Sequence, residues 1–155
     1  MTADHAALLN EVRYAERLCQ RTARFYRTVQ SAGTFAAVLG GSAALSAAFA
    51  SLPALVPISG AVVAAVVGAA LVAVRPADRA AQNEADMRRY SKLRTDGLAM
   101  TAEQLTLALA KARESDAAEL EPLRDVAWND VMRETGNEGL VLPLSKTQRT
   151  LAALA

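Results

Sequence analysis

The sequence has little of what catalytic and metal sites are built from. Its 155 residues include one cysteine, Cys19, and one histidine, His5. A single cysteine forms no intrachain disulfide and no cysteine-based metal cluster. One Cys and one His 14 residues apart make a poor nucleophile–base pair, and no GxSxG elbow, phosphate-cradling loop or zinc spacing is present. We therefore expect a protein that is not an enzyme, with no cofactor, no metal site and no nucleic-acid partner.

Charge is missing from one long segment. The 47 residues between Arg27 and Arg75 contain no Lys, Arg, Asp or Glu, so all 33 charged residues lie in the other 108 positions. A helix at the surface of a soluble domain has a polar face, and this segment cannot supply one. One membrane span takes roughly 20 residues, so the segment predicts two spans and a short turn.

Pro53 and Pro57 locate that turn, because proline breaks a helix interior. The predicted spans are about 34–52 and 58–74, and the hairpin covers 34–74. The alternative is a hairpin buried in a soluble protein, since 15 of the 47 residues are alanine. That alternative needs a protein shell around all 47 residues, which the remaining polar helices could hardly provide.

Basic residues flank the uncharged segment on both sides. Residues 1–27 carry five basic and three acidic groups, residues 75–94 carry six and three, and the turn carries none. Because positive charge stays on the cytoplasmic side of a membrane, both termini are expected in the cytoplasm.

The segment before the first span reads as an amphipathic helix, and we assign residues 1–33 to it. Apolar residues from Leu8 to Val29 recur at alternating steps of four and three, which is a heptad pattern. A basic row occupies another face. It is either a solvated face or a surface for anionic lipid headgroups; the headgroup candidates, with one after the second span, are Arg17, Arg21, Arg24, Arg27 and Arg75.

Residues 75–155 are expected to form a cytoplasmic helical region. A long helix is predicted from about Ala77 to about Ala118, with Gly97 marking a bend or a close crossing. Leu123–Arg133 is a short helix candidate, and 135–139 is a turn-rich break. The tail from Leu140 is either a short docking helix or disordered.

Small residues recur at helical spacing inside both spans. Such rows let helix backbones approach closely in lipid, where dispersion contacts replace the hydrophobic drive. One row suits the hairpin and another suits a second subunit, so a homo-oligomer is predicted, joined also by the heptad face. An alanine-rich composition alone also places small residues everywhere. The helix-packing candidates are Ala36, Gly40, Gly41, Ala44, Ala48, Gly60, Ala64 and Gly68.

Ser42 and Ser46, one helical turn apart, are the most polar pair within the spans. Serine in a span commonly bonds to its own helix backbone; the alternative is a weakly polar stripe that lines a water path between subunits. On that alternative Ser42 and Ser46 are the pore-lining candidates, and the valine-rich second span faces lipid.

The order of these elements resembles a known family. An Arg- and Tyr-bearing helix, Glu11-Val-Arg-Tyr14 through Arg24-Phe-Tyr-Arg27, leads into the small-residue hairpin. A helix containing Met87-Arg-Arg-Tyr-Ser-Lys-Leu93 follows. This layout, over residues 8–115, resembles the SLATT superfamily of two-transmembrane effector domains in bacterial anti-phage systems. The resemblance implies an oligomeric pore in the bacterial inner membrane, gated from the cytoplasm, with a cytoplasmic sensor or nucleotide-signal partner, and it implies no catalytic residues.

The leading hypothesis is therefore an all-α, pore-forming membrane effector. One alternative is a membrane anchor or scaffold, without a pore, that presents its cytoplasmic helices to a partner. Another is a holin-like lysis protein, which leaves the long cytoplasmic helix unexplained.

Overall fold

The computed structural model describes residues 3–42 and 55–155, and every regular element in those residues is a helix. The chain divides into two compact units. Unit 1 contains Met1–Phe25 and Arg79–Ala155, and unit 2 contains Tyr26–Asp78. The first helix, α1 (Ala3–Gly41), runs continuously through both, without a break at the predicted boundary after residue 33. The prediction of an all-α fold is confirmed.

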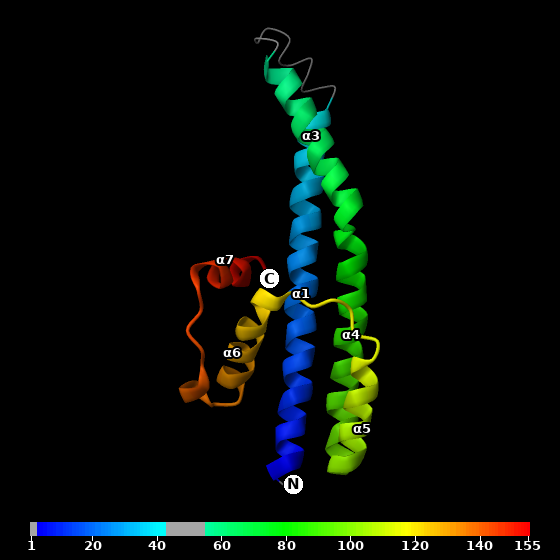
Figure 1. Ribbon diagram of the computed structural model, residues 1–155, viewed down its shortest axis with the longest axis vertical. Helices are drawn as coiled ribbons and strands as arrows, with labels where there is room; N and C mark the ends of the chain where they lie inside the picture. The colour runs from blue at the N-terminus through cyan, green and yellow to red at the C-terminus, as the bar shows by residue number, and fades with distance from the viewer. Residues whose placement is uncertain (1–2, 43–54) are drawn as a thin grey trace. The chain divides into compact units, whose positions relative to one another are not determined.

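The first core of unit 1 joins α1 to two later helices, α4 (Pro76–Asp96) and α5 (Ala102–Arg113) (Figure 1). Apolar side chains recur every three or four residues on each helix, so each buries one face. Val12, Tyr90 and Leu105 lie fully buried at the centre of this core. The core is completed by Leu9, Ala15, Cys19, Leu93, Leu109 and Ala112.

This core changes the interpretation of the heptad pattern. The pattern correctly identified the buried face of α1, because Val12, Ala15 and Cys19 are all buried. Their partners, however, are α4 and α5 of the same chain. That face is covered, so it is not available to join subunits in a coiled coil.

The predicted long helix over 77–118 is wrong. Helix α4 ends at Asp96, a 3-10 turn (η1, Gly97–Ala99) follows, and α5 begins at Ala102. A Cβ on Gly97 would lie 3.0 Å from Leu105 and 3.2 Å from Leu9, so the chain turns where two helices approach closely. The Gly97 carbonyl also accepts a hydrogen bond from Nε2 of His5, 2.9 Å away, which places His5 in a buried site at the start of α1.

Thr101 helps α5 to begin where it does. Its hydroxyl accepts a hydrogen bond from the Gln104 backbone N–H, while the Gln104 side chain accepts one from the Thr101 N–H. This reciprocal capping box satisfies two donors that the first turn leaves unpaired. The close approach at Gly97 and the cap at Thr101 together explain why the helix is interrupted.

A second core of unit 1 lies on another face of α1. Leu18 packs against Leu123 of the 3-10 turn η2 (Glu121–Leu123) and against Val126 and Ala127 of α6 (Arg124–Glu134). The last helix, α7 (Lys146–Leu154), adds Leu151 to this cluster. The helix predicted over 123–133 is confirmed, and of the two alternatives for the tail the structure has the docking helix.

Asn129 fixes the approach to α7. Its buried side chain donates to the Leu142 carbonyl at 2.8 Å and accepts from the Leu142 N–H at 2.7 Å. Trp128 donates to the carbonyl of Leu140, the last residue of the 3-10 turn η3 (Glu138–Leu140). A second capping box, Ser145 with Gln148, then starts α7.

Unit 2 pairs the last turns of α1 with α3 (Leu55–Val74). Gly33 lies beside Leu71, whereas Gly40 lies beside Gly60 and Ala64, so the two helices run antiparallel. Helix α3 begins at Leu55, earlier than predicted, and Pro57 lies in its first turn instead of in the connecting turn. Proline is tolerated there because the N–H groups of a first turn have no helical partner.

Candidate membrane interface and ligand groove

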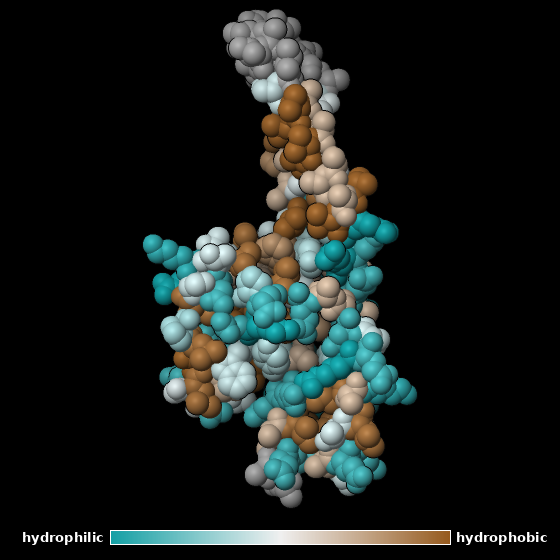
Figure 2. Space-filling view, in the orientation of Figure 1, coloured by the Kyte–Doolittle hydropathy of each residue, from teal (hydrophilic) through white to brown (hydrophobic). Residues whose placement is uncertain are grey.

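The outer surface of α3 is apolar and uncovered. Val62, Val66 and Val72 are 57%, 65% and 77% exposed, and the visible face of this helix in Figure 2 is coloured as hydrophobic. Phe35 and Val38 on the unit 2 part of α1 are also exposed. Burying apolar surface is worth about 25 cal/mol per Å², so a row of exposed valines indicates an environment other than water.

One described helical stretch, Ser59–Ala99, is long and apolar enough, by length and composition alone, to cross a membrane. The core helix of a soluble protein passes the same test while mostly buried, whereas only 6% of this stretch's most apolar window is buried. The other predicted span, 34–52, lies mostly outside the described residues. The two-span membrane hairpin therefore stays a prediction.

The contact between α1 and α3 depends on Gly40. A Cβ at this position would lie 2.6 Å from the Gly60 carbonyl oxygen and 3.0 Å from the Ala64 Cβ, so a larger residue would separate the backbones. Gly41 is more loosely placed, with Ala64 at 4.0 Å. Of the predicted packing residues, the structure brings together Gly40, Gly41, Gly60 and Ala64.

Gly68 lies outside that contact, with nothing within 4 Å of a Cβ built on it. The exposed alanines of α3, Ala61, Ala65, Ala69 and Ala73, are another row that the α1–α3 pair does not use. Ala36 lies half-buried in α1, and Ala44 and Ala48 lie outside the described residues.

The structure describes only one of the two predicted pore residues. Ser42 directly follows α1 and is half-buried, and Ser46 lies outside the described residues. Their assignment to a pore wall therefore stays a prediction.

Two of the predicted headgroup arginines have protein partners. Arg17 pairs with Glu134, and Arg21 pairs with Asp130 at 2.8 Å. Arg21 also donates to the carbonyls of Ala152 and Ala155, at 3.2 and 3.0 Å. Cations are favoured at a helix C-terminus because its last carbonyls lack partners. Sequence reasoning missed these acidic partners, which lie more than 100 residues away, so contacts of Arg17 and Arg21 with lipid headgroups are no longer proposed.

Arg75 marks the end of the apolar helix. It has a φ of 51°, in the left-handed region that costs a non-glycine residue roughly 1–3 kcal/mol. Its N–H still donates to Leu71, and its side chain pairs with Asp78 at 2.6 Å. Pro76 follows, and a proline disfavours the right-handed helical conformation in the preceding residue. Helix α3 therefore stops at Val74.

The link between α5 and α6 is held by a charged cluster on α4. Arg89 donates to Ser115 at 2.6 Å and to Asp116 at 2.7 Å. Tyr90 donates to Asp116 at 2.6 Å, and Asp86 accepts from the Ala117 N–H at 2.8 Å. Burial, with the hydrogen bond to Asp116, raises the pKa of Tyr90 well above its usual value.

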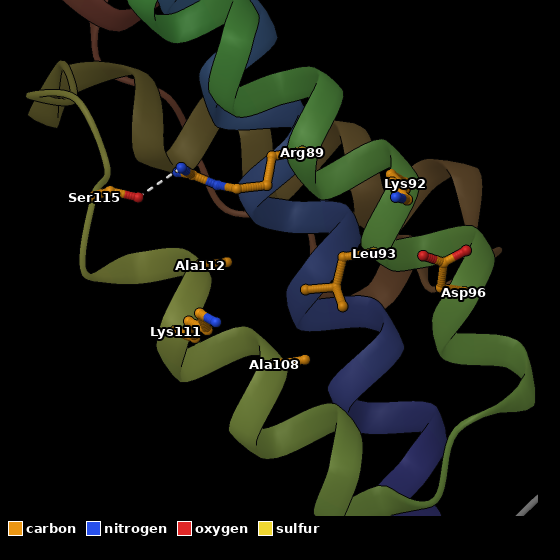
Figure 3. Close-up of a pocket in the computed structure, with 8 residues that line it drawn as sticks. All are labelled: Arg89, Lys92, Leu93, Asp96, Ala108, Lys111, Ala112 and Ser115. Atoms are coloured by element: carbon orange, nitrogen blue, oxygen red, sulfur yellow. Dashed lines mark hydrogen bonds between the residues drawn. The ribbon is translucent and has the colours of Figure 1, made fainter.

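Beside this cluster, a groove with a volume of about 340 Å³ lies between α4 and α5 (Figure 3). Its floor is Leu93, Ala108 and Ala112. Its rim carries Arg89, Lys92 and Lys111 with the single carboxylate of Asp96, and Ser115 closes one end. In Figure 3, Arg89 reaches from α4 toward Ser115, and the two alanine methyls project from α5 into the space between the helices.

Cys19 is buried and is poorly suited to act as a nucleophile. Its side chain is 3% exposed, and burial, with the neighbouring carboxylates of Asp116 and Asp86, raises its pKa to about 12. The thiol is therefore protonated at neutral pH. Within residues 3–42 and 55–155, no group of three or more His, Cys, Asp or Glu side chains could hold a metal ion.

No protein-family model, no curated protein and no solved structure matches this chain. The SLATT resemblance therefore stays a hypothesis, and the function proposed below depends on the contacts and exposed surfaces described above.

Proposed function

We propose that the chain is a membrane-embedded effector that oligomerises through its apolar helices and permeabilises the bilayer on a cytoplasmic signal. The observation that carries this proposal is the exposed apolar face of α3, because its valines lack protein cover. The proposed setting is bacterial anti-phage defence at the inner membrane, with both termini cytoplasmic. The location follows from the basic residues that flank the uncharged segment.

Self-association is proposed through the membrane helices alone. The heptad face of α1 is used within the chain, whereas Gly68 and the exposed alanines of α3 are not used by the α1–α3 contact. Small residues let a second helix approach closely in lipid. This supports an interface between copies along the row of Gly68 and the exposed alanines of α3, beside the valines that are proposed to face lipid.

Dye release from liposomes is the direct test of permeabilisation. The purified chain should release a small trapped dye, and Ser46→Leu should reduce release without changing the assembled mass in mild detergent. Val66→Leu is the control, because Val66 is proposed to face lipid. Release by Ser46→Leu equal to that of the parent, with a block by Val66→Leu, would assign the pore wall to α3 instead.

A membrane anchor that presents unit 1 to a partner is the second candidate. It is favoured by the finding that unit 1 has two cores of its own, on two faces of α1. An anchor would enter liposomes without releasing dye at any protein density. Recovery of the chain in floated liposomes that retain their dye would therefore favour the anchor over the pore.

A further inference from the structure

The groove between α4 and α5 has the composition of a ligand site. Its volume, about 340 Å³, falls at the lower end of the range for small-molecule pockets, roughly 300–1,000 Å³. Such pockets combine an apolar lining with a few polar groups that fix orientation. Here Leu93, Ala108 and Ala112 form the apolar part, and the polar groups gather at the rim.

Two lysines without partners in the described part of the chain line the groove and favour an anion. Arg89 is already paired with Asp86 and Asp116. Lys92 and Lys111, one on each helix, have no hydrogen-bond or ion-pair partner among the described residues. Only Asp96 opposes them in the lining. Each of the two helices therefore contributes one such ammonium group beside the apolar floor.

Ser115 adds a directional donor. Its oxygen accepts a hydrogen bond from Arg89 at 2.6 Å, so its own hydrogen is free to be donated to a ligand oxygen. A phosphate monoester offers three acceptor oxygens to such donors, whereas a carboxylate offers two.

We propose that this groove binds a small phosphate ester, with the phosphate between Lys92 and Lys111 and an apolar or aromatic part on the alanine floor. The phosphate can belong to a soluble ester or to a lipid headgroup, since both present the same group. The proposal concerns unit 1 and does not depend on whether the chain forms a pore.

The test is calorimetric titration of the full chain in a neutral detergent at pH 7.5, where a phosphate monoester is close to a dianion. The probes are phenyl phosphate, dihexanoyl phosphatidic acid below its micelle concentration, inorganic phosphate and benzyl alcohol. At least one ester should bind at least tenfold more tightly than inorganic phosphate or benzyl alcohol. Preference for phenyl phosphate indicates a soluble ligand, and preference for the phosphatidic acid indicates a lipid.

Matched variants separate this site from general charge attraction. Lys92→Gln with Lys111→Gln should weaken ester binding at least tenfold, and Asp96→Asn should strengthen it, because it removes the opposing carboxylate. Lys146→Gln on α7 should bind like the parent. Equal binding of inorganic phosphate and the esters, no binding at millimolar ester, or equal loss in Lys146→Gln would each overturn the proposal.

Discussion

Helix α1 contributes to both units, and the exposure of its apolar side chains differs between them. In unit 1 its apolar side chains are covered by protein, and Val12 and Leu18 are 0% and 1% exposed. In unit 2 the large apolar side chains toward its end are uncovered, and Phe35 and Val38 are 66% and 62% exposed. The same helix thus packs like a soluble core at one end and presents an apolar surface at the other.

The contacts between helices also differ between the two units. Unit 1 holds its helices with long-range ion pairs such as Arg94–Glu16 and Arg113–Glu11. Unit 2 contacts are between small residues, as at Gly40 with Gly60. Close packing of small residues is how helices associate in lipid, where burial of apolar surface gives no net drive. The contrast supports water around unit 1 and lipid around unit 2.

The strongest test of this contrast compares two equally exposed apolar residues. Val66 in α3 is 65% exposed and Leu107 in α5 is 67% exposed. Val66→Arg should prevent stable membrane insertion, because an arginine at the centre of a span costs about 2.5–3.5 kcal/mol. Leu107→Arg should leave insertion and melting temperature unchanged, because its side chain faces water.

The measurement is the fraction of chain that resists carbonate extraction from membranes. Val66→Leu controls for a change of size alone. If Val66→Arg is retained like the parent, α3 does not face lipid and the comparison between the units fails.

Gly40→Leu and Gly68→Leu test which small residues pack α1 against α3 and which pack one copy of the chain against another. Gly40→Leu should weaken the α1–α3 contact by about 1–3 kcal/mol, because the new side chain meets the Gly60 carbonyl. Gly68→Leu should leave that contact intact and reduce self-association. The readouts are cross-linking between cysteines placed at Gly33 and Leu71, which face each other across the helix pair, in a Cys19→Ala background, and mass in mild detergent. A monomeric parent would end the oligomer proposal.

Arg21→Gln should loosen α7 within unit 1. The side chain has 22% exposure and bonds Asp130 and two α7-end carbonyls, so its loss should cost about 1–3 kcal/mol. Limited proteolysis should then cut the segment after Leu140 several times faster. Arg88→Gln, an exposed position on α4, is the control, and equal cleavage rates in both variants would contradict the role of Arg21.

The smallest expected effect is a change in stability at high pH. Burial raises the Cys19 pKa to about 12, so its contribution to stability is complete below the ordinary thiol pKa of about 9 and falls as pH rises toward 12. Cys19→Ala should therefore flatten the loss of helical signal between pH 9 and 12. Because the Tyr90 pKa is also raised, some alkaline loss should remain in the variant, and an unchanged pH profile would contradict the Cys19 contribution.

Local patterns predicted the buried face of α1 and the helix near 123–133, because these depend on apolar spacing between residues close in sequence. They did not decide between a docking helix and disorder for the tail, and they did not separate α4 from α5. Gly97 was correctly expected at a bend or close crossing. The sequences Thr101-Ala-Glu-Gln104 and Ser145-Lys-Thr-Gln148 are capping boxes, and they could have located the starts of α5 and α7.

The segments that pack against these helix faces could not be predicted from local patterns. A heptad face is equally suited to a second copy of α1 or to α4 and α5, and only the fold selects between them. Likewise, the basic row of α1 gave no sign that Glu134 and Asp130 would meet Arg17 and Arg21. The groove between α4 and α5 is lined by residues of two separate helices. The sequence was interpreted as one long helix over 77–118, so this groove was not predicted.

The first core has a consequence for synthesis on the ribosome. Val12 and Cys19 are made early, but their packing partners Tyr90, Leu105 and Leu109 are made much later. At ~5–20 residues per second, the N-terminal half of α1 waits several seconds for α4 and α5, and the uncharged segment leaves the ribosome during that interval. The apolar face of α1 is therefore left without its packing partners until α4 and α5 have been made, so the first core of unit 1 forms only late in synthesis.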